Sequence, residues 1–148
     1  MKTSILALCA LSFLAPVTAS AHCQVPCGIF DNDNVIGKLH TDFETIEKAS
    51  KQIEELSKDP ANLHQVTRWI FQKEAHAQSI QETVMTYFLA QRIKLEEADS
   101  DKEAYLKKLT TCHKVIIAAM KCKQGTSAAG VKTLHDELQI LAGLFGTK

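Results

Sequence analysis

Residues that bind transition metals are concentrated near the start of the chain, in the stretch His22-Cys23-Gln24-Val25-Pro26-Cys27. A chain that began at His22 would offer its α-amine, the peptide nitrogen of Cys23 and two thiolates, which can together occupy the corners of a square plane. Square-planar sites with nitrogen donors favour Cu(II) or Ni(II), whereas zinc prefers tetrahedral sites. Thiolate and amide anions also stabilise a higher oxidation state. The pattern therefore indicates a redox metal site, with the His22 imidazole as an axial ligand.

Two other interpretations of this stretch stay open. A disulfide loop between Cys23 and Cys27 is typical of an oxidising compartment, and Cys-x-x-x-Cys is by itself a weakly specific pattern. An exported helical protein that binds copper or nickel without turnover would use the same ligands. The adjoining cleavage site, the histidine at the new terminus and the Pro-Cys-Gly sequence favour the redox site.

The first 21 residues have the features of a signal peptide. Lys2 gives a positive start, and residues 5–17 are almost wholly apolar but too short to span a membrane. Ala19-Ser20-Ala21 is an A-x-A cleavage site for signal peptidase, so we expect the mature chain to begin at His22. No later stretch is long and apolar enough for a membrane span. We therefore predict an exported protein, periplasmic or secreted, with no membrane segment in its mature form.

Composition predicts one soluble domain that does not bind nucleic acid or membrane surfaces through its charge. Cleavage would leave about 127 residues, enough for one domain with a hydrophobic core. The chain has 17 basic and 17 acidic residues, a balance that argues against binding to nucleic acid or a membrane surface. Four cysteines remain once Cys9 is removed with the leader. Cys112 and Cys122 would lie about 15 Å apart in one continuous helix, so we expect them to be buried free thiols.

The segments that must hold the metal stretch are predicted to be helical, starting with two helices. Turn formers make residues 31–40 irregular, and a capping box of Thr41 and Glu44 opens a first helix. Asp59 as N-cap and Pro60 at the first position open a long second helix that runs to about Glu96. Their buried stripes are predicted to be Phe43, Ile46, Ile53 and Leu56, then Leu63, Val66, Ile70, Ile80, Val84 and Phe88.

Two further helices complete the predicted fold. A capping box of Ser100 and Glu103 opens a third helix, which Gly125 ends, and Thr126 or Ser127 caps a fourth. Their apolar stripes are Tyr105, Leu109, Ile116 and Met120, then Val131, Leu134, Leu138 and Leu141. Without any strand pattern, this predicts an all-α protein: an up-down antiparallel four-helix bundle at residues 31–148, preceded by an irregular metal-binding hook at residues 22–30.

The other aromatic and histidine residues are assigned no chemistry. Trp69 is expected to pack in the bundle. The remaining histidines, apart from His22, are predicted at the surface or at bundle edges: His40, His64, His76, His113 and His135. The sequence has no repeated Glu-x-x-His pattern on two helices, so a di-iron bundle is unsupported.

The stretch from His22 to Phe30 resembles the hook of nickel superoxide dismutases, whose mature chains begin His-Cys-x-x-Pro-Cys-Gly-x-Tyr. Weaker similarity continues through Leu63-His64, Arg68-Trp69, Lys73–Ala77 and Tyr87–Lys94. The resemblance implies a homohexamer of four-helix bundles that converts superoxide to dioxygen and hydrogen peroxide, with one nickel ion per subunit cycling between +2 and +3. It also implies signal peptidase and nickel-loading factors as partners.

Carried over residue by residue, the resemblance assigns the metal ligands to three positions. His22 would supply the amine and the axial imidazole, Cys23 an amide nitrogen and a thiolate, and Cys27 the second thiolate, while Pro26 would shape the loop. Tyr87 matches a family tyrosine near the active site, although ordinary packing in the bundle is an equal alternative.

This sequence also departs from the family at several positions. Phe30 stands where the family has a tyrosine beside the open face of the metal, and Gln24 stands where an acidic residue is common. The family orients the axial imidazole through a Glu and an Arg. Here residues 37–40 occupy the Glu region, and His76 stands at the Arg position.

Overall fold

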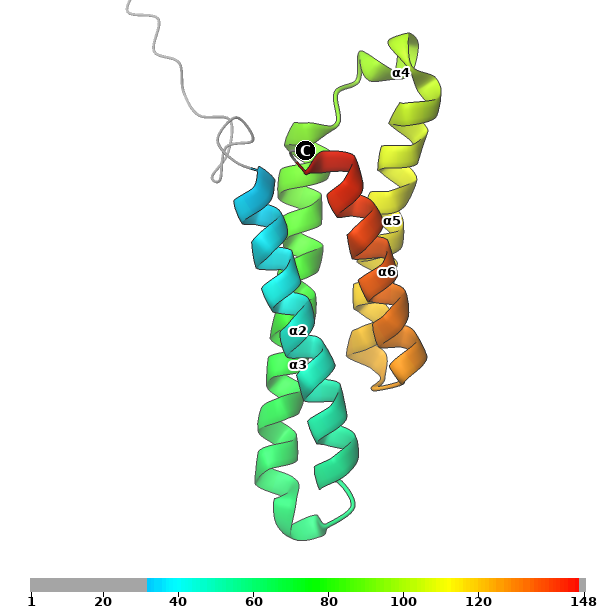
Figure 1. The fold of residues 1–148 in the computed structure, drawn as a ribbon. Coiled ribbons are helices and arrows are strands. Elements are labelled where there is room, and N and C mark those ends of the chain that lie inside the picture. The colour runs from blue at the N-terminus through cyan, green and yellow to red at the C-terminus, as the bar shows by residue number, and fades with distance from the viewer. Residues whose placement is uncertain (1–31, 147–148) are drawn as a thin grey trace, which may run out of the picture.

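The computed structural model describes residues 32–146, which form helices joined by short connections (Figure 1). No strand occurs among these residues, and none of their helices is long and apolar enough to cross a membrane. In chain order the elements are α2 (Asn32–Leu56), η2 (Pro60–Asn62), α3 (Leu63–Thr83), η3 (Val84–Arg92), α4 (Glu97–Ser100), α5 (Lys102–Gln124) and α6 (Ala128–Phe145).

Within the described part of the chain, four long rods make an up-down antiparallel bundle, as predicted. α2 packs against α3 and α6, and α5 also packs against α3 and α6. The N-terminal end of α2 and the C-terminal end of α6 lie at the same end of the bundle (Figure 1). At the opposite end, α2 and α3 extend beyond the turn that joins α5 to α6.

The core consists of aliphatic and aromatic side chains from all four rods. Each fully buried side chain of this size stabilises the fold by about 1.5–3 kcal/mol relative to exposure. The largest are Leu39 and Ile46 from α2, Ile80 from α3, Val84, Tyr87 and Phe88 from η3, Cys112 and Val115 from α5, and Leu134 and Leu141 from α6.

The prediction of an irregular segment at residues 31–40 was wrong, because α2 begins at Asn32 and continues through Gly37. Val35 and Leu39 are buried together with Phe43, so they extend the apolar stripe of the helix towards its start. This burial outweighs the weak turn preference of the polar residues between them. The capping box at Thr41 was wrong for the same reason: its hydroxyl donates to the Gly37 carbonyl in mid-helix, at 3.1 Å.

The other helix ends follow the sequence closely. Asp59 accepts a hydrogen bond from the Ala61 amide at 2.9 Å, with Pro60 next to it, although the element that it caps is the short turn η2. Ser127 caps α6 by accepting from the Gly130 amide, and Gly125 ends α5. The Ser100 capping box was wrong by one residue: Asp101 is the cap of α5, and Ser100 belongs to α4.

The second rod differs from its prediction at both ends. It continues as the π-helix η3 and ends at Arg92, short of Glu96; the Ile93 amide donates to the Phe88 carbonyl five residues back. At the other end, Leu63 and Ile70 are 69% and 42% exposed, contrary to the predicted stripe. Both precede Lys73, which contacts the last turn of α5, and the first part of α3 extends past the turn that joins α5 to α6 (Figure 1).

The buried face of α5 is also rotated from the predicted one. Its fully covered residues include Cys112, Val115 and Ala119, whereas Tyr105, Leu109 and Ile116 pack at the edge of the core. Small residues therefore face the other helices. On α6 the predicted stripe of Val131, Leu134, Leu138 and Leu141 is confirmed.

Candidate functional site

The predicted hook, residues 22–30, and the signal peptide lie outside the described residues, and so do the site residues His22, Cys23, Cys27 and Phe30. The structure describes the end of the bundle from which the hook leads. That end is built from the first turn of α2, the π-helix η3 and the last turn of α6.

Tyr87 is the predicted site residue that the structure describes, and it lies at this end of the bundle. Its ring is 1% exposed, and its hydroxyl donates to Oδ1 of Asn32 at 2.7 Å. Asn32 follows Phe30 by two positions, so the Tyr87 hydroxyl reaches the start of the helix to which the hook is joined. Its role at the metal site stays a prediction.

The position of Tyr87 is set by packing in η3 and α6. The ring meets Phe88 edge-on at a centroid distance of 5.1 Å, and Phe88 in turn contacts Phe145 of α6 at 4.9 Å. Gly146 follows Phe145, and a Cβ atom there would lie 2.7 Å from the Ala142 carbonyl oxygen. A glycine is therefore needed for α6 to end this tightly. π-helices are frequent at functional sites, which agrees with the place of η3 beside the start of α2.

A polar cluster lies between α2 and α3, centred on Asp42. The Asp42 carboxylate is nearly buried and accepts hydrogen bonds from Lys38 at 2.8 Å and Ser79 at 2.7 Å, and it lies 2.7 Å from His76 Nδ1. Burial alone would raise the pKa of Asp42, but the hydrogen bonds from Lys38, Ser79 and His76 outweigh it and hold the pKa below 3.8.

Two members of this cluster lie where the family resemblance associates a Glu and an Arg. Lys38 belongs to the region of the Glu, and His76 stands at the position of the Arg; the structure joins them through Asp42. Asp42 was not among the predicted site residues. Its spacing of four residues from Lys38, on the stripe that contains Leu39 and Ile46, was the pattern that could have revealed it.

The two cysteines of α5 are unsuited to metal binding or disulfide formation. Cys112 and Cys122 are buried free thiols, as predicted. Burial raises the pKa of Cys112 to about 11, and burial also raises the pKa of Cys122 despite the nearby Lys73. Both therefore stay protonated at neutral pH, whereas metal ligation needs a thiolate. Residues 32–146 also contain no group of three or more His, Cys, Asp or Glu placed to hold a metal ion.

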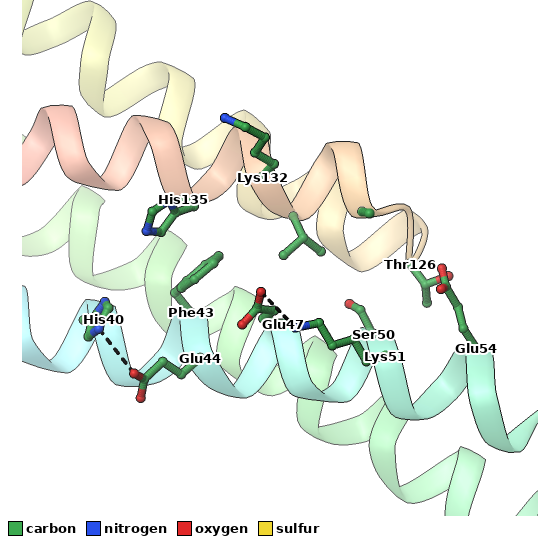
Figure 2. Close-up of a pocket in the computed structure, with 12 residues that line it drawn as sticks. His40, Phe43, Glu44, Glu47, Ser50, Lys51, Glu54, Thr126, Lys132 and His135 are labelled. Carbon is green, nitrogen blue, oxygen red and sulfur yellow. Dashed lines mark ion pairs between the residues drawn. The ribbon is translucent and has the colours of Figure 1, made fainter.

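A cleft of about 390 Å³ runs between α2 and α6 (Figure 2). The Phe43 ring lies in it, 5.0 Å from the ring of His135 on α6. His40 is paired with Glu44 on its own helix at 3.3 Å. The cleft brings together groups from two helices but no set of metal ligands. As predicted, His40 lies at the surface and His135 at a bundle edge; Trp69 is half-buried, with Lys48 Nζ 5.7 Å from its ring centroid.

Comparison with known proteins identifies the family. The model of the family described as nickel-containing superoxide dismutase matches residues 17–148, which include the predicted hook and the whole bundle. No curated protein and no solved structure gives a significant match. Because the family match covers most of the chain, this protein belongs to the nickel-containing superoxide dismutases, and it is an oxidoreductase of that class.

Proposed function

We propose that this chain dismutates superoxide at the hook formed by residues 22–30, with His22, Cys23 and Cys27 as the nickel ligands. The observation that carries the proposal is the family match, because it includes the stretch in which an amine, an imidazole and two thiolates occur within six residues. This donor set fits nickel. Support also comes from Cys112 and Cys122, whose buried, protonated thiols do not compete for the metal.

In this proposal the hook holds one nickel ion per subunit. When bound, nickel supplies one-electron redox chemistry between +2 and +3, so that one superoxide is oxidised to dioxygen and a second is reduced, with two protons, to hydrogen peroxide. The chain contributes the ligands and the order of the surrounding groups. Phe30 contributes an apolar ring where a tyrosine would donate a hydrogen bond. Tyr87 and Asn32 connect the first turn of α2 to the body of the bundle.

We also propose that the active form is an exported homohexamer that signal peptidase cleaves after Ala21 and that accessory proteins load with nickel. Apolar side chains on the protruding part of α3 support a contact between subunits: Leu63 and Phe71 are 69% and 68% exposed. Light scattering of the mature protein should give a mass near that of six protomers. N-terminal sequencing of the natural protein should give His22 as the first residue. A fully active monomer, or another first residue, would contradict these proposals.

The decisive experiment inserts one alanine before His22, so that the mature chain begins Ala-His-Cys. The described bundle should keep its helicity, since the insertion precedes residues 32–146. The amine moves away from Cys23, and the nitrogen of His22 becomes an amide. We expect dismutase activity to fall on the order of a hundredfold, the scale of losses in metal-site variants. The matched control adds the same alanine after Lys148 and should be fully active.

The same proteins separate the competing functions. Nickel content, superoxide consumption and intact mass are measured for the unmodified mature protein and for both extended forms. Unchanged activity in the Ala-His-Cys protein would exclude the amine as a ligand. Bound nickel or copper without turnover in the unmodified protein would favour a metal-binding protein. A mass two hydrogens lower, without metal, would favour a Cys23–Cys27 disulfide.

A further inference from the structure

The cleft between α2 and α6 contains a buried hydroxyl group that has no hydrogen-bond partner. Ser50 lines the cleft and is 3% exposed, and none of the described residues pairs with its Oγ atom. Native proteins leave few buried polar groups unsatisfied, because each one destabilises the fold. On the same helix, the hydroxyls of Thr41 and Thr45 each donate to the carbonyl oxygen four residues back. The Ser50 hydroxyl makes no such bond, and its side chain points from α2 towards α6 (Figure 2).

The charge in this cleft that lacks a partner is negative. Glu54 follows Ser50 by one helical turn on the same face of α2 and also lines the cleft. Its carboxylate makes no hydrogen bond or ion pair with the described residues. The other ionisable side chains that line the cleft each lie near an ionisable partner: His40 near Glu44, Glu47 near Lys51, and Lys132 and His135 near Asp136.

Apolar side chains from both helices line the same cleft. Phe43 of α2 and Val131 of α6 are both buried. Phe43 precedes Ser50 by seven residues, which is about 10 Å along the helix axis. The cleft has a volume of about 390 Å³, within the range of small-molecule sites. It therefore offers an apolar surface together with two oxygen-bearing groups, the Ser50 hydroxyl and the Glu54 carboxylate.

We propose that this cleft binds a primary alkylammonium ion. An ammonium group has three donors and no acceptor, so it can donate to Ser50 Oγ and to the Glu54 carboxylate at once. The alkyl chain would lie against Phe43 and Val131, where its burial is favourable. An anion would be repelled by Glu54. The start of α6, which would attract an anion, is already capped by the Ser127 side chain.

The walls of the cleft can part to admit this ligand. Water does not reach Ser50 Oγ in the structure, so the ammonium group must enter the narrow floor of the cleft. Of the four neighbouring pairs of rods, α2 and α6 are the most loosely packed. Within the described part of the chain, the ion pairs of the cleft join residues of one helix, and none links α2 to α6. Opening the cleft therefore breaks no ion pair.

The test titrates the mature protein with n-hexylammonium chloride at constant ionic strength. Saturation-transfer NMR measures the dissociation constant from the signals of the ligand, with or without nickel. We expect a dissociation constant on the order of 1 mM, typical of a ligand of this size. Glu54→Gln should weaken binding about threefold, and Ser50→Ala about fivefold. Glu55→Gln is the matched control: Glu55 does not line the cleft, so its replacement should leave binding unchanged.

Two probes with the same alkyl chain test the charge of the ligand. n-Hexanol is neutral and n-hexanoate is an anion, so we expect both to bind several-fold more weakly than n-hexylammonium. Intermolecular nuclear Overhauser effects should connect the methylene protons of bound n-hexylammonium with the Val131 methyl groups, which places the ligand in the cleft.

Each of these measurements can overturn the inference without affecting the proposed function. Absence of saturation transfer, or equal binding of n-hexanol or n-hexanoate, would overturn it. So would unchanged binding in Ser50→Ala or Glu54→Gln, and so would a bound ligand that shows no contact with Val131. Circular dichroism confirms that each variant is folded before binding is compared. Dismutase activity does not enter any of these comparisons, so a negative result leaves the nickel site untouched.

Discussion

Replacing Lys73 by methionine tests how the described bundle holds α5 against α3. The Lys73 side chain is 4% exposed, and its ammonium donates to the carbonyl oxygens of Cys122 and, at 2.7 Å, of Lys123. These carbonyls belong to the last turn of α5, where the backbone has no helical partners and the helix dipole is negative. Methionine keeps much of the length and apolar surface of the stem but cannot donate.

The magnitude follows from two opposing effects. Each buried carbonyl left without a donor costs about 1–3 kcal/mol. The variant no longer has to bury an ammonium, a burial that costs several kcal/mol before its hydrogen bonds compensate. The hydrogen bond to the Lys123 carbonyl is only part-buried, which reduces the cost of losing it. We expect Lys73→Met to lower the free energy of unfolding by about 2–3 kcal/mol.

Urea unfolding of both proteins at one protein concentration measures this difference. With a slope of about 1–3 kcal/mol per molar urea, the midpoint should fall by about 0.7–3 M without a change in slope. Lys51→Met is the matched control: Lys51 is 70% exposed and pairs with Glu47, so its loss should cost less than about 0.5 kcal/mol. A midpoint for Lys73→Met at or above that of the unmodified protein would refute the reasoning. Burial of the ammonium would then destabilise the fold by at least as much as its hydrogen bonds stabilise it.

Two further predictions concern titratable groups in the bundle. The folded pKa of Asp42 lies below 3.8, so its contribution to stability is complete above about pH 4 and is lost as pH falls through the folded pKa. Asp42→Asn should therefore be less stable than the unmodified protein at pH 6, and the difference in the free energy of unfolding should be smaller at pH 3. Equal differences in urea unfolding at both pH values would contradict this. Burial and a pKa of about 11 should keep Cys112 unreactive towards iodoacetamide in the native protein at pH 8, and mass spectrometry should find it modified only after unfolding; rapid native labelling would contradict the buried placement.

Helix ends and apolar stripes were predictable where they depend on neighbouring residues. Asp59 and Ser127 cap within three residues, and Gly125 ends α5 as its sequence indicates. The stripe of α6 was also predictable, because its leucines recur at the helical period. The hook has the same local character: its proposed ligands lie within six residues, so its chemistry can be inferred from the sequence alone.

Tertiary packing decided the features that join distant parts of the chain. Turn-forming residues at the start of α2 are helical because Val35 and Leu39 find cover in the bundle. Asp42 and His76 are 34 residues apart, and Asn32 and Phe145 are 113 apart; no local pattern links either pair. Their contacts exist because antiparallel rods bring these positions to the same level. The sequence by itself determined most of the helices and the residue types of the proposed hook, whereas only the packing of the rods decided which polar groups meet.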